Sequence, residues 1–84
     1  MMKEARLSFK KNDTNQDIMV ISNGRKGLGK IIFEITYWPT SAESTIAAKN
    51  SCFLNAKKFG IKKLWVESIY GKSIDLDESI DLEK

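Results

Sequence analysis

Apolar and polar residues alternate in two stretches of the first half of the chain, and this period of two predicts β-strands. Residues 6–10 alternate and predict a first strand, which ends in a polar cluster at residues 11–17. Residues 18–21 form a near-continuous apolar run, which is typical of a strand in the centre of a sheet. Residues 31–38 predict a third strand, and the side chains expected to face the helix are Ile31, Phe33, Ile35 and Tyr37.

The pattern changes to a helical period after Pro39. Thr40 and Glu43 have the spacing of a capping box, and Gly60 stands where a residue in the left-handed conformation closes a helix. Residues 61–70 return to rough alternation with β-branched and aromatic side chains, which predicts a further strand. The helix side chains expected in the core are Ile46, Ala48, Cys52, Phe53, Ala56 and Phe59, whereas Ala47 and Leu54 fall outside that stripe.

These elements predict an α+β fold with a three-stranded antiparallel sheet, one helix and then a further strand, in the order β-β-β-α-β. We expect a single domain over residues 1–72 and an acidic C-terminal tail over residues 73–84. The tail holds an imperfect six-residue repeat, Ser-Ile-Asp-Leu-Asp-Glu followed by Ser-Ile-Asp-Leu-Glu-Lys. Its Ile and Leu residues leave two roles open, an edge strand or a contact with a partner.

The segment between the second and third predicted strands is rich in glycine and in cations. Gly24, Gly29 and Lys30 match the first half of a P-loop, but Ile31 replaces the magnesium-binding Ser or Thr, and a strand follows where that motif needs a helix. A hairpin turn explains the glycines better, with Arg25, Lys26 and Lys30 displayed at its tip.

The composition argues against an enzyme. The chain has one cysteine and no histidine, which excludes disulfide frameworks, Cys/His zinc sites and histidine-based triads. We expect Cys52 to be a small buried hydrophobe, and we expect no cofactor, metal or small-molecule substrate. No apolar run approaches the length of a membrane helix, and the N-terminal residues show no apolar signal core.

Charge is distributed unevenly along the chain. Residues 1–72 carry a net charge of +7 and residues 73–84 a net charge of −4. A basic body favours a phosphate-bearing partner, although a solvated lysine-rich surface is the alternative. Trp38 likewise has two interpretations, closing the edge of the core or stacking on a base.

Several sequence blocks, taken in order, resemble one family of ribosomal proteins. Ser8-Phe9 followed by Asn12-Asp13-Thr14 is one block, and the second is Ile-Met-Val-Ile-Ser-Asn at residues 18–23 with Gly27-Leu28-Gly29. The third and most specific block is the ungapped run Cys-Phe-Leu-Asn-Ala-Lys-Lys-Phe-Gly-Ile-Lys-Lys-Leu-Trp-Val at residues 52–66. Over residues 6–71 the chain is similar to the universal small-subunit ribosomal protein number eleven, a component of the ribosomal platform.

The resemblance implies a structural constituent of the small ribosomal subunit that binds rRNA and neighbouring platform proteins. The chain lacks the family's glycine- and basic-rich stretch before the helix, its glycine-proline-arginine loop after the last strand and its basic C-terminus. This shortening resembles a mitochondrial version, with a ribosome of the bacterial cytoplasm as the alternative location. The expected RNA-binding residues are Lys10, Lys11, Asn12, Thr14, Arg25, Lys26, Lys30, Lys62 and Lys63.

Other classes of function remain open at this stage. A sheet with one helix also builds small DNA-binding or phage-type accessory modules. A protein-binding inhibitor that uses Leu54 and the tail is a further alternative.

Overall fold

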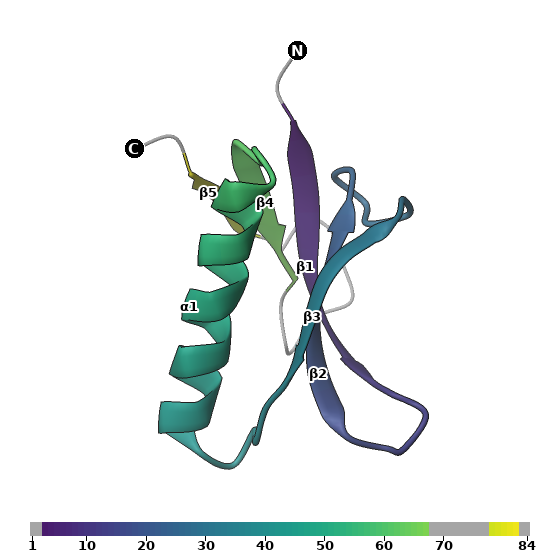
Figure 1. The fold of residues 1–84 in the computed structure, drawn as a ribbon, viewed down its shortest axis with the longest axis vertical. Coiled ribbons are helices and arrows are strands. Elements are labelled where there is room, and N and C mark those ends of the chain that lie inside the picture. Colours follow the sequence, from purple (N-terminus) through teal and green to yellow (C-terminus); the bar gives the residue numbers. More distant parts are fainter. Residues whose placement is uncertain (1–2, 68–77, 83–84) are drawn as a thin grey trace.

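The computed structural model describes residues 3–67 and 78–82 and shows an α+β fold with one sheet and one helix (Figure 1). The elements are β1 (Glu4–Lys11), β2 (Asp17–Asn23), β3 (Ile31–Thr36), α1 (Ala42–Lys58), β4 (Lys63–Val66) and β5 (Glu78–Asp81). The five strands lie in the order β3-β2-β1-β4-β5. The strand count therefore differs from the predicted one, and the sheet is mixed because β1 and β4 are parallel.

The first three strands form an antiparallel meander with β2 in its centre. Leu7 pairs with Ile21, and Ile21 pairs with Phe33, so these residues share the face that meets the helix. A β-bulge follows at Ile21/Ser22 and shifts the register. The strand therefore presents Ile31 to solvent with 51% of its surface exposed, and the prediction that Ile31 faces the helix is wrong.

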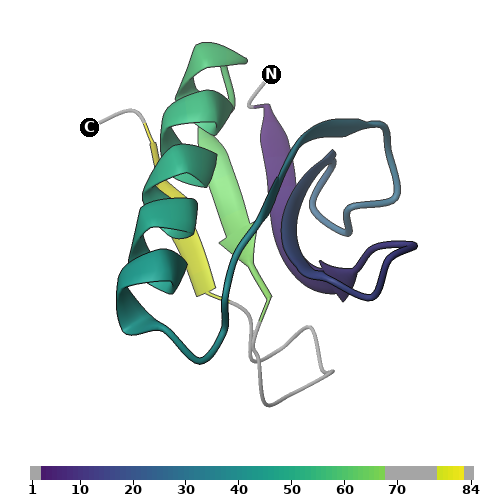
Figure 2. The ribbon, with the colours of Figure 1, turned by 60° about the horizontal axis from the view of Figure 1, so that its bottom comes forward.

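The fifth strand comes from the segment predicted as an acidic tail. β5 pairs antiparallel with β4, placing Asp81 opposite Lys63 and Ile80 opposite Leu64. Ile80 and Leu82 add apolar surface to the core. The ribbon of β5 runs beside α1 (Figure 2). An edge strand is thus the role of residues 78–81, while residues 73–77 of the first repeat copy and the predicted end of β4 at residues 68–70 lie outside the described residues.

The helix begins one residue later than the sequence predicts. Its N-cap is Ser41, whose Oγ accepts a hydrogen bond of 3.1 Å from the backbone N–H of Ser44. Thr40 is exposed and does not cap the helix, so the capping-box prediction is wrong by one position. Thr40 and Ser41 are adjacent and both suit an N-cap, and the capping-box spacing to Glu43 fits Thr40 although Ser41 is the cap.

The C-terminus of α1 closes as predicted at Gly60. Gly60 has a φ of +79°, and its N–H donates to the carbonyl of Lys57 while Ile61 N–H donates to the carbonyl of Ala56. These two bonds are the Schellman pattern, which satisfies carbonyls at the end of a helix. Ile61 is buried next to Ala56 in the core, so the turn also directs the chain into β4.

Three small residues make up the buried stripe of the helix: Ala48, Cys52 and Ala56. Phe53 is partly buried beside them, but Ile46 and Phe59 are 59% and 48% exposed, which contradicts their predicted core position. The reason is geometric, because Ile46 lies well over 90° around the helix from the Ala48–Cys52–Ala56 stripe and Phe59 falls after the last turn. Leu54 is 55% exposed, as the pattern predicts.

No helix in residues 3–67 is long and apolar enough to span a membrane.

Candidate nucleic-acid interface

The nine residues predicted to bind RNA divide between the two ends of the sheet. Arg25, Lys26 and Lys30 lie in the β2–β3 loop and Lys62 and Lys63 at the start of β4, all beside the beginning of β1. Lys10, Lys11, Asn12 and Thr14 lie at the other end of β1, about 23 Å away at roughly 3.3 Å per residue. The fold therefore offers two separate surfaces.

The β2–β3 loop is folded across the sheet face that α1 does not cover. Gly24 N–H donates to the carbonyl of Glu4 over 2.9 Å, and Arg6 Nε donates to the carbonyl of Arg25 over 2.9 Å. A Cβ atom on Gly27 would lie 3.1 Å from Arg6 Cδ, so this loop position packs directly on the Arg6 side chain. The loop is thus held against β1 rather than displayed freely at a hairpin tip.

The side chain of Arg25 packs against an aromatic ring of β4. Its guanidinium carbon lies 4.1 Å from the centroid of the Trp65 ring, and Lys63 Nζ lies 5.2 Å from the same centroid. The indole Nε1 of Trp65 donates to a carboxylate oxygen of Glu4 over 2.9 Å. The aromatic ring therefore brings two predicted RNA-binding cations together, at distances where cation–π attraction operates.

The C-terminus of the helix adds further cations to this end of the molecule. Lys57 and Lys58 lie in the last turn of α1, where positive charge complements the helix dipole. Lys3 Nζ donates to the carbonyl of Phe59 over 3.0 Å, and the carbonyl of Lys3 accepts from the N–H of Lys62 over 2.9 Å. We call the surface formed by these cations the basic end; its members are Lys3, Arg25, Lys26, Lys30, Lys57, Lys58, Lys62 and Lys63.

At the opposite end of the sheet, the polar side chains predicted to contact RNA form hydrogen bonds within the β1–β2 turn. Asn12 Oδ1 accepts hydrogen bonds from Thr14 N–H, Thr14 Oγ1 and Gln16 N–H over 2.9 to 3.0 Å. Asn15 follows with a φ of +63°. Asn12 and Thr14 therefore shape the turn, while Lys10 is exposed and Lys11 Nζ lies 3.4 Å from a carboxylate oxygen of Asp17.

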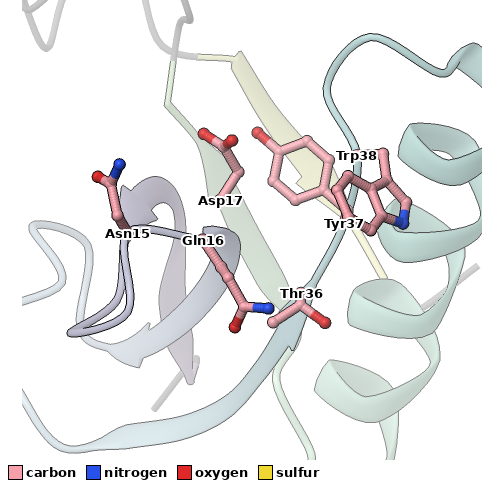
Figure 3. Close-up of a pocket in the computed structure, with 6 residues that line it drawn as sticks. All are labelled: Asn15, Gln16, Asp17, Thr36, Tyr37 and Trp38. Atoms are coloured by element: carbon pink, nitrogen blue, oxygen red, sulfur yellow. The ribbon is translucent and has the colours of Figure 1, made fainter.

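A pocket of about 170 Å³ lies beside this turn, where β2 begins and β3 ends (Figure 3). Its lining residues are Asn15, Gln16, Asp17, Thr36, Tyr37 and Trp38. Trp38 is 72% exposed, so it does not close the edge of the core as one sequence interpretation held. The pKa of Tyr37 is raised by burial and, to a smaller extent, by the charge of Asp17, which keeps the phenol neutral.

Sequence reasoning missed Trp65, Lys3 and the pocket. Trp65 sits in a run with strand periodicity, where an aromatic residue is expected to pack, and nothing local predicts that a loop from between β2 and β3 will reach it. The pocket requires the register that sets Asp17 opposite Tyr37, shown by the 3.1 Å hydrogen bond from Tyr37 N–H to the carbonyl of Asp17. The one sequence signal was Trp38 itself, an aromatic residue at the end of a predicted strand, for which stacking on a base was one interpretation.

The described residues offer little for covalent or metal chemistry. Cys52 is fully buried, and desolvation raises the pKa of its thiol to about 11, so the reactive thiolate is disfavoured at neutral pH. Within residues 3–67 and 78–82, no group of three or more Cys, Asp and Glu side chains is placed to hold a metal ion.

Comparisons with models of known families, with curated proteins and with solved structures find no match to this chain.

Proposed function

We propose that the chain is a structural, non-catalytic protein of the small ribosomal subunit that binds rRNA and neighbouring platform proteins. The proposal combines the block resemblance over residues 6–71 with the basic end. Its most direct support is that cations from the β2–β3 loop, the end of α1 and the start of β4 converge at one end of the sheet. Such a cluster suits the phosphate backbone of folded RNA, which is bound largely through shape, phosphate and 2′-hydroxyl contacts.

The proposed mechanism is electrostatic docking on a rigid surface. Arg25 and Lys63 lie against Trp65 and the β2–β3 loop is bonded to β1, so little side-chain and loop freedom remains to be lost on binding. The exposed Lys26 and Lys30 supply phosphate contacts from the same loop. By analogy with shortened organellar proteins, we assign the chain to a mitochondrial ribosome, with the bacterial cytoplasm as the alternative.

The test is co-sedimentation of the tagged chain with ribosomal subunits from its source cells, at low and at high salt. The proposal expects the chain in the small-subunit fraction at both salt concentrations. Reversing Lys26 and Lys30 to Glu should lower the bound fraction several-fold, because both side chains are exposed and their charges are removed from the docking surface.

The matched control is reversal of Lys49 to Glu, which alters charge in the middle of α1, away from the basic end. It should leave the bound fraction near the wild-type value. Absence of the chain from every ribosomal fraction, together with salt-dependent binding to duplex DNA, would favour a DNA-binding accessory protein instead.

A further inference from the structure

The pocket beside Trp38 has the features of a site for one flat, polar group. Its volume of about 170 Å³ is smaller than the roughly 300 to 1,000 Å³ of pockets that enclose a drug-sized ligand. It is bounded by Gln16 and Asp17 at the start of β2 and by the segment from Thr36 to Trp38 at the end of β3 (Figure 3). A single planar ring with polar edges matches this size and lining.

Trp38 is held in place although its ring is exposed. Its backbone N–H donates to Ser44 Oγ over 2.9 Å, and its carbonyl accepts from Ser41 N–H over 3.0 Å. Both partners belong to the start of α1, so the backbone of Trp38 is fixed between the strand and the helix. A large aromatic side chain that is 72% exposed on a fixed backbone is a ready platform for stacking.

The polar side chains of the pocket supply both a donor and an acceptor. Gln16 Oε1 accepts from Asn12 Nδ2 over 3.1 Å, which orients the amide and leaves its Nε2 group as a donor. Asp17 contributes a carboxylate that is 31% exposed. Figure 3 shows the Asp17 carboxylate on the Tyr37 side and the Gln16 amide on the Thr36 side, so the amide of Gln16 is the group available to the polar edge of a base.

Two lysines lie next to the pocket, and one of them is paired with Asp17. Lys11 Nζ lies 3.4 Å from both carboxylate oxygens of Asp17, and Lys10 is exposed one residue before it. Proteins that bind single-stranded nucleic acid combine an aromatic stacking platform with cations that follow the backbone. The arrangement at this end of the sheet has both components.

We propose that this pocket binds one unstacked base of single-stranded RNA, with Trp38 stacking on the base, Gln16 contacting its polar edge, and Lys10 and Lys11 contacting the flanking phosphates. This inference rests on the proposed role in RNA binding and adds a second contact, about 23 Å from the basic end by strand geometry. The basic end binds structured RNA through its phosphates, whereas the Trp38 pocket selects a base that is not paired in an RNA duplex.

The experiment measures the affinity of the full chain for a short single-stranded RNA and for a duplex of the same sequence by fluorescence anisotropy. Replacing Trp38 by Ala should weaken single-strand binding about ten-fold, since stacking on an aromatic side chain is lost, and should leave duplex binding unchanged. Trp38→Phe should retain most of the single-strand affinity. Leu54→Ala, which truncates another exposed apolar side chain on α1, should change neither affinity.

A spectroscopic readout separates stacking from an indirect structural effect. The chain has two tryptophans, so Trp38 is the only one left in a Trp65→Phe variant. Its fluorescence should be quenched by the single-stranded RNA and not by the duplex. Equal single-strand affinity of the wild type and Trp38→Ala, or equal losses on both RNAs, would overturn the proposal.

These measurements also distinguish this inference from the proposed function. If the chain co-sediments with small subunits but Trp38→Ala binds single-stranded RNA like the wild type, the pocket assignment is wrong and the ribosomal role stands. If Trp38-dependent binding is present and the chain is absent from ribosomal subunits, the pocket assignment stands and the ribosomal role is wrong.

Discussion

The guanidinium carbon of Arg25 lies 4.1 Å from the centre of the Trp65 ring and joins two parts of the sheet that are not neighbours. Arg25 belongs to the β2–β3 loop, and Trp65 belongs to β4 on the far side of β1. The loop must therefore cross β1, which it does over the Arg6 side chain. This contact fixes the position of the loop that carries Lys26 and Lys30.

The first prediction concerns the energy of this contact. Arg25→Ala and Trp65→Leu should each destabilise the protein, and a double-mutant cycle should give a coupling of about 0.5 to 1 kcal/mol in the free energy of unfolding. Urea denaturation of the four proteins measures it. Lys26→Ala, next in the same exposed loop, should change the stability by less than about 0.5 kcal/mol. A coupling of zero would show that the ring and the guanidinium do not interact in solution.

The second prediction separates the two candidate caps of α1. Ser41→Ala removes the side chain that accepts the Ser44 N–H bond and should cost about 1 kcal/mol of stability. Thr40→Ala should cost close to nothing, because Thr40 is exposed and makes no cap. Thermal unfolding followed by circular dichroism compares the two variants. A loss for Thr40→Ala with none for Ser41→Ala would place the helix start at Thr40, as the sequence pattern suggests.

The sequence predicts the parts of this fold that depend on local chemistry. The first three strands, the single helix and the closure at Gly60 follow from periodicity and from the conformational freedom of glycine, and the structure bears them out. The burial of Cys52 follows for the same reason. Each of these features depends on residues that are close together in the sequence.

The features that the sequence does not predict depend on contacts between distant segments. The sequence pattern places Ala48, Cys52 and Ala56 in the core correctly but adds Ile46 and Phe59, which are exposed, because the pattern does not show how much of the helix surface the sheet covers. The Arg25–Trp65 contact and the Asp17–Tyr37 pairing exist only once the strand order and register are fixed. No local pattern carries that information.

The third prediction tests the turn that closes α1. Gly60 has a φ of +79°, and a Cβ atom at this position would meet nothing within 4 Å. The cost of Gly60→Ala is therefore conformational, about 1 kcal/mol, because the left-handed region disfavours residues with a Cβ atom. Gly60→Asn should cost less, since asparagine tolerates this region better. The free energy of unfolding in urea is the measurement, and a stabilised Ala variant would contradict the observed turn.

The last prediction concerns alkaline pH. Burial raises the pKa of the Cys52 thiol from 9.0 to about 11, so between these values the unfolded chain releases a proton that the folded chain keeps. The stabilisation is therefore complete below pH 9 and is lost as the pH rises toward 11, by about 2 to 3 kcal/mol. Tyr37, whose pKa is also raised, adds its own pH dependence, and this contribution is common to the wild type and a Cys52→Ala variant. The difference in stability between the two proteins should thus shrink or reverse as the pH rises from 8 to 11, and a constant difference would mean that the folded thiol ionises as freely as an exposed one.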